Sequence, residues 1–171
     1  MAVLQKCRLL SLAFALIWPD THPVLSADDV DLLRTSFREA AKDRTRLAAL
    51  FYDRLFEITP EARPLFAADL EEQRAKMMST LGSIVAQIHA FDALRPIVGD
   101  LAVRHVRYGV RAEHYPQVGE ALLWALRQAL DTRFTPPVEA AWTRAYEALS
   151  AAMIEASYPL KGTNPSWAPD L

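Results

Sequence analysis

The chain has 171 residues, of which 51% are hydrophobic, and its formal net charge at pH 7 is -2. This length suits one domain with a substantial core, and the near-balance of acidic and basic residues gives no indication of a nucleic-acid partner. The single cysteine, Cys7, excludes a disulfide framework or a cysteine metal site within the domain, and no apolar run there is long enough for a typical membrane-spanning helix.

Residues 1–25 differ from the rest of the chain. Lys6 and Arg8 precede an apolar run over residues 9–18, and prolines and small residues follow. A basic start, a short apolar middle and small residues are typical of a secretory signal, and a disordered N-terminal extension is the alternative. We expect a cytoplasmic protein, or a periplasmic or secreted one if residues 1–25 act as a signal segment.

From Ser26 onward the pattern is helical almost throughout. Ser26, followed by Asp28 and Asp29, is a hydroxyl cap with acids in the first helical turn. No segment alternates as a strand does, so the predicted class is all-α, with one domain over residues 26–158 and a loose tail over 159–171. Apolar stripes within 30–37 and 47–56 predict the first two helices, a short helix starts at Thr59-Pro60, and longer helices are expected at about 69–89, 94–108, 116–131 and 135–157.

His105 lies in the last turn of the expected helix 94–108. Gly109 can end that helix, and Pro116 can open the next one. Imidazole is the commonest protein ligand of metals, and one histidine can hold a haem iron. The alternative is an ordinary histidine on an amphipathic helix. His114, in the loop after Gly109, suits a structural role.

Four local patterns occur in order along the chain: LFYDRLF at 50–56, PEARPLF at 60–66, an Arg-His…Tyr-Gly-Val…His-Tyr-Pro-Gln-Val-Gly series at 104–119, and AWTRAY at 141–146. Together they resemble the globin family, above all the single-domain bacterial haemoglobins and the globin domain of flavohaemoglobins. The resemblance implies a globin fold, a three-over-three helical sandwich around one haem b, and reversible binding of dioxygen at ferrous iron.

The same resemblance assigns the proximal side and the haem contacts. His105 would be the iron ligand, Phe66 the ring stacked on the haem, and Tyr115 the support of His105. Arg104 could pair with a haem propionate, with a solvated surface charge as the alternative. The implied cofactor-binding residues are His105, Phe66, Met77, Tyr115, Val110 and Arg104.

On the distal side, Leu70, Gln73, Met77 and Leu81 share one helix face by their spacing. The resemblance places Gln73 at the distal polar position and Met77 over the haem, whereas alone they would be a solvated amide and core filler. Tyr52 would point at the bound gas in the resembled family, and a core tyrosine is the alternative. Its O–H and the Gln73 N–H would stabilise the partial negative charge of bound oxygen.

Two departures from the family limit this reading. Flavohaemoglobins support the proximal pair with a glutamate, but the matching position here is Ser157, and Glu155 lies about 200° away around a helix. No Gly-rich dinucleotide fingerprint is present, so nitric-oxide dioxygenation would need a separate reductase. A haem-based gas or redox sensor and a haem-free globin-like interaction module are the alternatives from other functional classes.

Overall fold

The computed structural model describes residues 25–66 and 69–157, so the predicted tail 159–171 and all but Leu25 of the segment 1–25 lie outside the described residues. Within the described part all regular structure is helical, which confirms the all-α class. No described helix is long and apolar enough to cross a membrane. The α-helices are α2 (Ala27–Ala40), α3 (Arg44–Ile58), α4 (Leu70–Gln87), α5 (Arg95–Arg107), α6 (Tyr115–Leu130) and α7 (Pro136–Ser157), and the 3-10 segments are η1 (Ala41–Asp43), η2 (Pro60–Phe66), η3 (Ile88–Leu94), η4 (Ala112–His114) and η5 (Asp131–Arg133).

Short polar side chains begin α2, α3 and α4, and the first of them, Ser26, is the cap that the sequence predicts. Ser26 Oγ accepts the Asp29 backbone N–H, and the Ser26 backbone N–H donates to the Asp29 carboxylate, both at 3.1 Å. Asp43 and Asp69 accept backbone N–H groups at the starts of α3 and α4 in the same way. These bonds satisfy amide groups that have no partner inside the helix.

The predicted helix 69–89 ends earlier than expected. Helix α4 stops at Gln87, and η3 follows with a kink at Ala90, where φ is -122° and ψ is 66°. Arg34 of α2 donates to the Ala86 carbonyl at 2.6 Å and lies 2.7 Å from Nδ1 of His89. A side chain from another helix therefore satisfies the end of α4.

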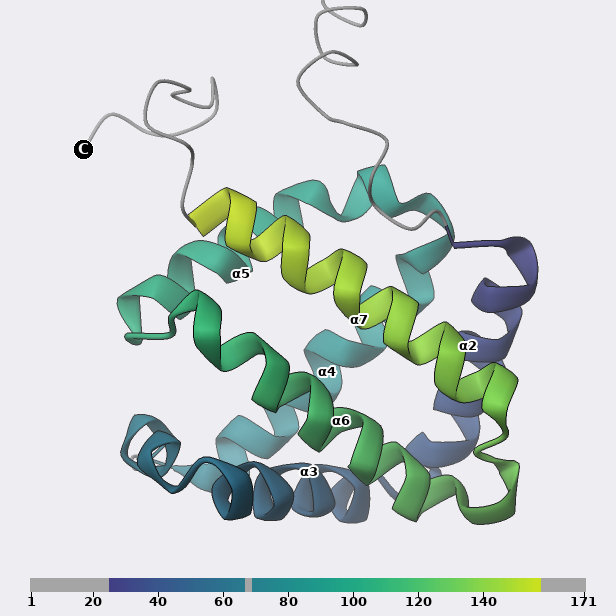
Figure 1. Cartoon of the computed structure of the whole chain (residues 1–171), viewed down its shortest axis with the longest axis horizontal. Helices are drawn as coiled ribbons and strands as arrows, with labels where there is room; N and C mark the ends of the chain where they lie inside the picture. Colours follow the sequence, from purple (N-terminus) through teal and green to yellow (C-terminus); the bar gives the residue numbers. More distant parts are fainter. Residues whose placement is uncertain (1–24, 67–68, 158–171) are drawn as a thin grey trace, which may run out of the picture.

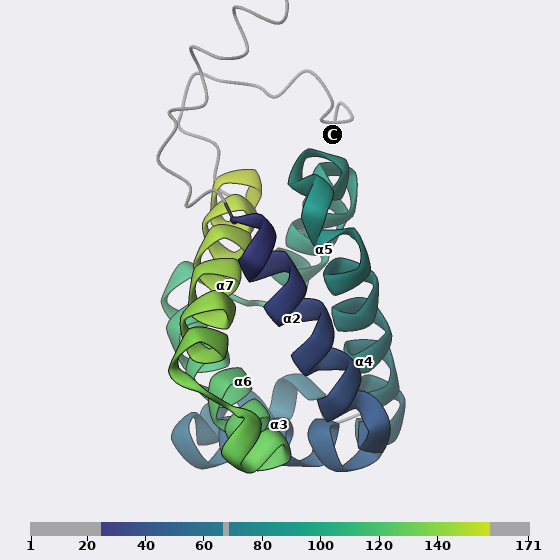
Figure 2. The same ribbon diagram turned by 90° about the vertical axis from the view of Figure 1, so that its right-hand side faces the viewer.

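The helices surround one apolar core. Figure 2 shows α6 and α7 on one side, α4 and α5 on the other, and α2 crossing in front. Helix α3 packs against α6 and α4, while α7 packs against α5 and α2. Helices that are far apart in the sequence thus lie side by side (Figure 1).

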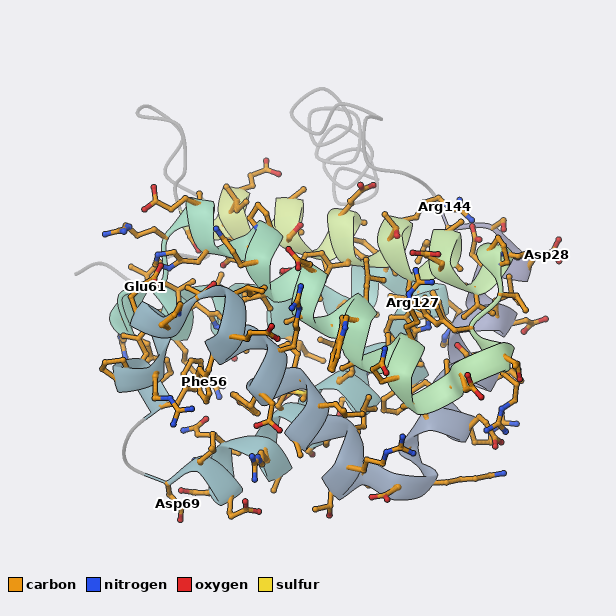
Figure 3. The ribbon with its side chains drawn as sticks, turned by 60° about the horizontal axis from the view of Figure 1, so that its bottom comes forward. Asp28, Phe56, Glu61, Asp69, Arg127 and Arg144 are labelled. Carbon is orange, nitrogen blue, oxygen red and sulfur yellow. The ribbon has the colours of Figure 1, made fainter. Side chains whose placement is uncertain are left out.

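Two polar contacts join α2 to α7. The Trp142 indole N–H donates to Ser36 Oγ at 3.0 Å in the interior. Arg144 forms an ion pair with the buried carboxylate of Asp29, and its Nε lies 3.3 Å from that group. Figure 3 shows Asp28 and Arg144 at one end of the molecule and Phe56, Glu61 and Asp69 at the other.

Candidate functional site

His105 lies in the last turn of α5, where the chain turns sharply toward α6. Gly109 has a φ of +80°, a conformation that glycine adopts without steric strain. The Val110 N–H donates to the His105 carbonyl, and the Gly109 N–H to the Val106 carbonyl, both at 2.9 Å. This is a Schellman ending, which confirms the predicted role of Gly109.

The imidazole of His105 is half-buried and held by its own helix. Its Nδ1 lies 2.8 Å from the Leu101 carbonyl oxygen, so the N–H on Nδ1 donates there. Burial lowers the pKa of His105, and the hydrogen bond to Leu101 only partly opposes that shift. A neutral ring with its proton on Nδ1 leaves the Nε2 lone pair available to a metal.

Tyr115 supports this ring from the start of α6. The two rings lie roughly parallel, with centroids 6.5 Å apart and an interplanar angle of 23°. The Tyr146 hydroxyl of α7 donates to the Tyr115 backbone carbonyl at 2.5 Å. A Cβ on Gly119 would come within 2.5 Å of the Tyr146 ring, so the glycine makes room for it.

Tyr146 has a role that the sequence reasoning did not assign. It is part of the AWTRAY pattern, but nothing local indicates a contact with Tyr115. Gly119, a glycine inside a helix, is the signal that could have indicated a close approach.

The end of α7 carries the two residues considered for proximal support. Ser157 is half-buried, and its Oγ is buried without a hydrogen-bond partner among the described residues. Glu155 is exposed. The two side chains therefore differ in exposure.

Tyr52 of α3 is 3% exposed and sits among aromatic rings. It contacts Phe66 edge to face at a centroid distance of 5.3 Å, with Phe51 and Phe56 also adjacent. Burial raises the pKa of the Tyr52 phenol to about 12, with a smaller opposing effect from Arg74. The phenol therefore keeps its O–H at neutral pH and remains a hydrogen-bond donor.

The Tyr52 hydroxyl lies 3.4 Å from the backbone carbonyl of Gln73, which is long for an O–H···O hydrogen bond. A long bond of this kind leaves the hydroxyl free to turn toward a better acceptor. The Gln73 side-chain amide makes no hydrogen bond to a described residue. The Tyr52 hydroxyl therefore lies beside the backbone of the residue that carries the second predicted donor.

The other predicted distal residues share helix α4 with Gln73. Leu70, Gln73, Met77 and Leu81 are all half-buried, consistent with one shared face of α4 at the edge of the core. Next to Phe66 lies a pocket of about 540 Å³, and Arg63 covers the Phe56 ring at 4.8 Å. The pocket is lined by Phe56, Pro60, Arg63, Pro64, Phe66 and Leu70.

The remaining candidate residues lie apart from the surroundings of Tyr52 and from the His105–Tyr115 pair. Arg104 is exposed and Val110 half-buried. His114 Nδ1 accepts the Arg111 N–H at 3.2 Å, a structural contact as expected, and His89 faces Arg34. His22 lies outside the described residues.

The structure brings together two groups of candidate residues: Tyr52 with Gln73 and Phe66, and His105 with Tyr115. Helix α6, which begins at Tyr115 and packs on α3, connects the two groups.

Comparison with known proteins decides the family. The globin family model matches residues 49–153, which is more than half of the chain. The chain is a globin. The matched range contains every candidate residue of both groups, from Tyr52 to Tyr146.

The relatives of this globin come from several lineages. An uncharacterized globin-like protein of Aquifex aeolicus is 30% identical over 131 residues, covering 77% of this chain and 93% of its own. The flavohemoprotein of Bacillus subtilis is 25% identical, and the match covers 77% of this chain but 34% of that longer protein. Among solved structures, an engineered carbene transferase derived from a putative nitric oxide dioxygenase of Rhodothermus marinus is 32% identical with a TM-score of 0.70, covering 78% and 93% of the two chains.

Proposed function

We propose that this globin holds haem b through His105 and binds dioxygen reversibly at the ferrous iron. The observation that carries the proposal is the placement of the His105 imidazole, which is half-buried in the last turn of α5 and held through Nδ1 by the Leu101 carbonyl. Globin haem iron needs one protein ligand of this kind on its proximal side. No described group of three or more His, Cys, Asp or Glu residues could hold a metal ion instead.

Residues on both sides support a haem site. Phe66 and Met77 are partly buried against the core and would supply apolar surface on the distal side, and Tyr115 would pack behind the ligand. Bound haem would supply an iron that binds diatomic gases. Tyr52 would donate its O–H to dioxygen in the distal pocket, and the Gln73 amide would add a second donor.

Absorption spectra of the purified protein test this proposal. We expect a Soret band from stoichiometric haem, and distinct ferric, ferrous and oxygenated spectra. His105→Ala should abolish haem binding or change the spectrum, because no other described side chain is placed as the proximal ligand. His89→Ala is the matched control, since His89 is exposed and contacts Arg34.

The outcome also separates the other functional classes. A protein without a Soret band, or an unchanged spectrum in His105→Ala, would contradict the proposal and favour a haem-free interaction module. A sensor would bind haem, but its gas binding would change the activity of an output partner.

Nitric-oxide dioxygenation is the second candidate. It is favoured by the 32% identity to a chain derived from a putative nitric oxide dioxygenase. Rapid mixing of the oxygenated protein with nitric oxide, with and without a reductase, tests it. Repeated nitrate production in the presence of the reductase indicates an enzyme, whereas a single equivalent of nitrate with no further turnover indicates a carrier.

The cellular compartment is a separate proposal. We infer a cytoplasmic location from the weak match of residues 1–25 to a cleavage site, since Ser26 caps α2. Sequencing the N-terminus of the mature protein tests this, and removal of the segment would place the protein outside the cytoplasm.

A further inference from the structure

Exposed apolar side chains gather at the end of α5. Among the described residues the exposed large hydrophobic side chains are Leu65, Val103, Val106 and Tyr108, and three of these fall within residues 103–108. Val103 is 38% exposed, Val106 41% and Tyr108 63%. Single exposed apolar residues are normal on a protein surface, but grouped ones mark sites of interaction.

The same segment carries positive charge that no described residue neutralises. Arg104 and Arg107 are exposed, and neither forms an ion pair or hydrogen bond with a described side chain. Other exposed arginines, such as Arg127 and Arg133, pair with glutamates. Two exposed guanidinium groups thus lie three residues apart, without an ion pair to a described side chain, on a chain whose net charge is -2.

These residues form one continuous surface, which we call the α5 patch: Val103, Arg104, Val106, Arg107 and Tyr108. Positions three and four apart are neighbours on a helix, which places Val106 and Arg107 beside Val103. The five residues themselves include no Lys, Asp or Glu, and the exposed Asp100 borders them one turn earlier on α5. Protein interfaces are enriched in Tyr and Arg and depleted in those three residues.

The α5 patch also lies close to the candidate iron ligand. The imidazole of His105 turns inward toward Tyr115, whereas the patch residues are exposed. An α-helix with its side chains is about 10–12 Å across. A protein bound at the patch would therefore be separated from His105 by one helix.

We propose that the α5 patch docks an acidic electron-transfer protein or domain that returns the haem iron of this globin from the ferric to the ferrous state. The proposal rests on the proposed function. In the step the reduced donor loses one electron and the ferric iron gains it, and no bond forms or breaks. Basic side chains would steer an acidic donor to the patch, and the apolar centre would hold it briefly.

Stopped-flow reduction of the ferric holoprotein by reduced flavodoxin, an acidic flavin protein, tests the proposal. Arg107→Glu and Val106→Asp should each lower the second-order rate constant, with Arg107→Glu lowering it by about tenfold or more at low ionic strength and weakening its salt dependence. Reduction by dithionite and the rate of oxygen dissociation should stay at wild-type values. Arg38→Glu is the matched control, because Arg38 is exposed at the end of α2 and has no described partner.

A binding measurement provides a readout apart from reduction. Titration of the ¹⁵N-labelled carbonmonoxy protein with oxidised flavodoxin should shift backbone amide signals of residues 103–108, and Arg107→Glu should remove the shifts. Wild-type reduction rates in both variants, together with no shifts in this segment, would overturn the docking proposal while leaving haem binding intact.

Two further outcomes are distinguishable. A wild-type dimer that Val106→Asp converts to a monomer, with no change in reduction rate, would identify the patch as a contact between two copies and overturn the proposal. Failure to bind haem would overturn the proposed function itself, and it is visible in the spectrum before any donor is added.

Discussion

At the scale of single residues, Tyr52 carries the largest expected effect on gas binding. Its phenol is buried, protonated and only weakly held by the Gln73 carbonyl. A hydrogen bond to a charged acceptor contributes about 1.5–3 kcal/mol. We expect Tyr52→Phe to speed oxygen dissociation by about tenfold or more, measured by stopped-flow displacement with carbon monoxide.

Tyr108→Phe is the control for that measurement, since Tyr108 is exposed at the surface. It should leave the dissociation rate unchanged. An unaltered rate in Tyr52→Phe would remove Tyr52 from the distal role.

His105 should also make stability depend on pH. Burial lowers its pKa in the folded chain, so near pH 6.5 the unfolded chain binds the proton more readily. The free energy of unfolding should therefore be highest above that pH and decrease as the pH falls through it toward the lower folded value. Thermal unfolding of the haem-free wild type and of haem-free His105→Leu between pH 5 and 8 measures this, and equal pH slopes in the two proteins would contradict it.

At the scale of elements, the contact between α6 and α7 depends on one glycine. A Cβ at Gly119 would meet the Tyr146 ring at 2.5 Å, whereas at Gly82 of α4 the nearest atom would be 3.6 Å away. We expect Gly119→Ala to destabilise the protein by about 1–3 kcal/mol, and Gly82→Ala to be neutral or to stabilise it by up to about 1 kcal/mol. Chemical denaturation measures both, and equal effects would show that Tyr146 moves freely.

Most elements follow from local sequence signals. Three signals act within a few residues: the Ser26 cap of α2, the Thr59-Pro60 start of η2 and the Gly109 ending of α5. The structure has each one close to its expected position. The end of α4 differs because its determinant is not local. Arg34, 52 residues earlier, bonds to the Ala86 carbonyl, and no window around Gln87 contains that information.

The candidate site likewise contains features that local sequence predicts and features that depend on tertiary packing. The spacing of Gln73 and Met77 and the place of His105 before Gly109 can be predicted from the chain itself. The support of Tyr115 by Tyr146, 31 residues later, and the exposure of Val103 and Val106 depend on tertiary packing. The sequence therefore suggests the side chains expected to meet the gas and Tyr115 behind His105, but it does not indicate Tyr146, which holds the Tyr115 backbone.

At the scale of the whole molecule, Asp29 joins the first and last described helices. Its carboxylate forms an ion pair with the Arg144 guanidinium and also accepts the Ser26 backbone N–H at the start of α2. The hydrogen bond from Arg144 holds the pKa of Asp29 below its ordinary value of 3.8, an effect that outweighs the opposing effect of burial. The stability it contributes is present above that pH and is lost as the pH falls through the lower folded value.

We expect Asp29→Asn to lower the free energy of unfolding at pH 7 by about 1–2 kcal/mol, because the charge-assisted bonds to Arg144 are lost. The difference from the wild type should shrink below pH 4. Denaturant titrations at pH 7 and pH 3 measure it, with Asp31→Asn of the exposed face as the control. A difference that persists unchanged at pH 3 would show that the carboxylate charge is not responsible.

The ending of α5 makes the proposed iron ligand experimentally separable from the corner that carries it. His105 closes the turn with its main-chain carbonyl, to which Val110 donates, and Gly109 supplies the left-handed backbone. Replacing the imidazole leaves both of these features in place. A His105 variant that loses haem while keeping its helical content would therefore report on coordination alone, and an added imidazole could refill the vacated space as a detached ligand.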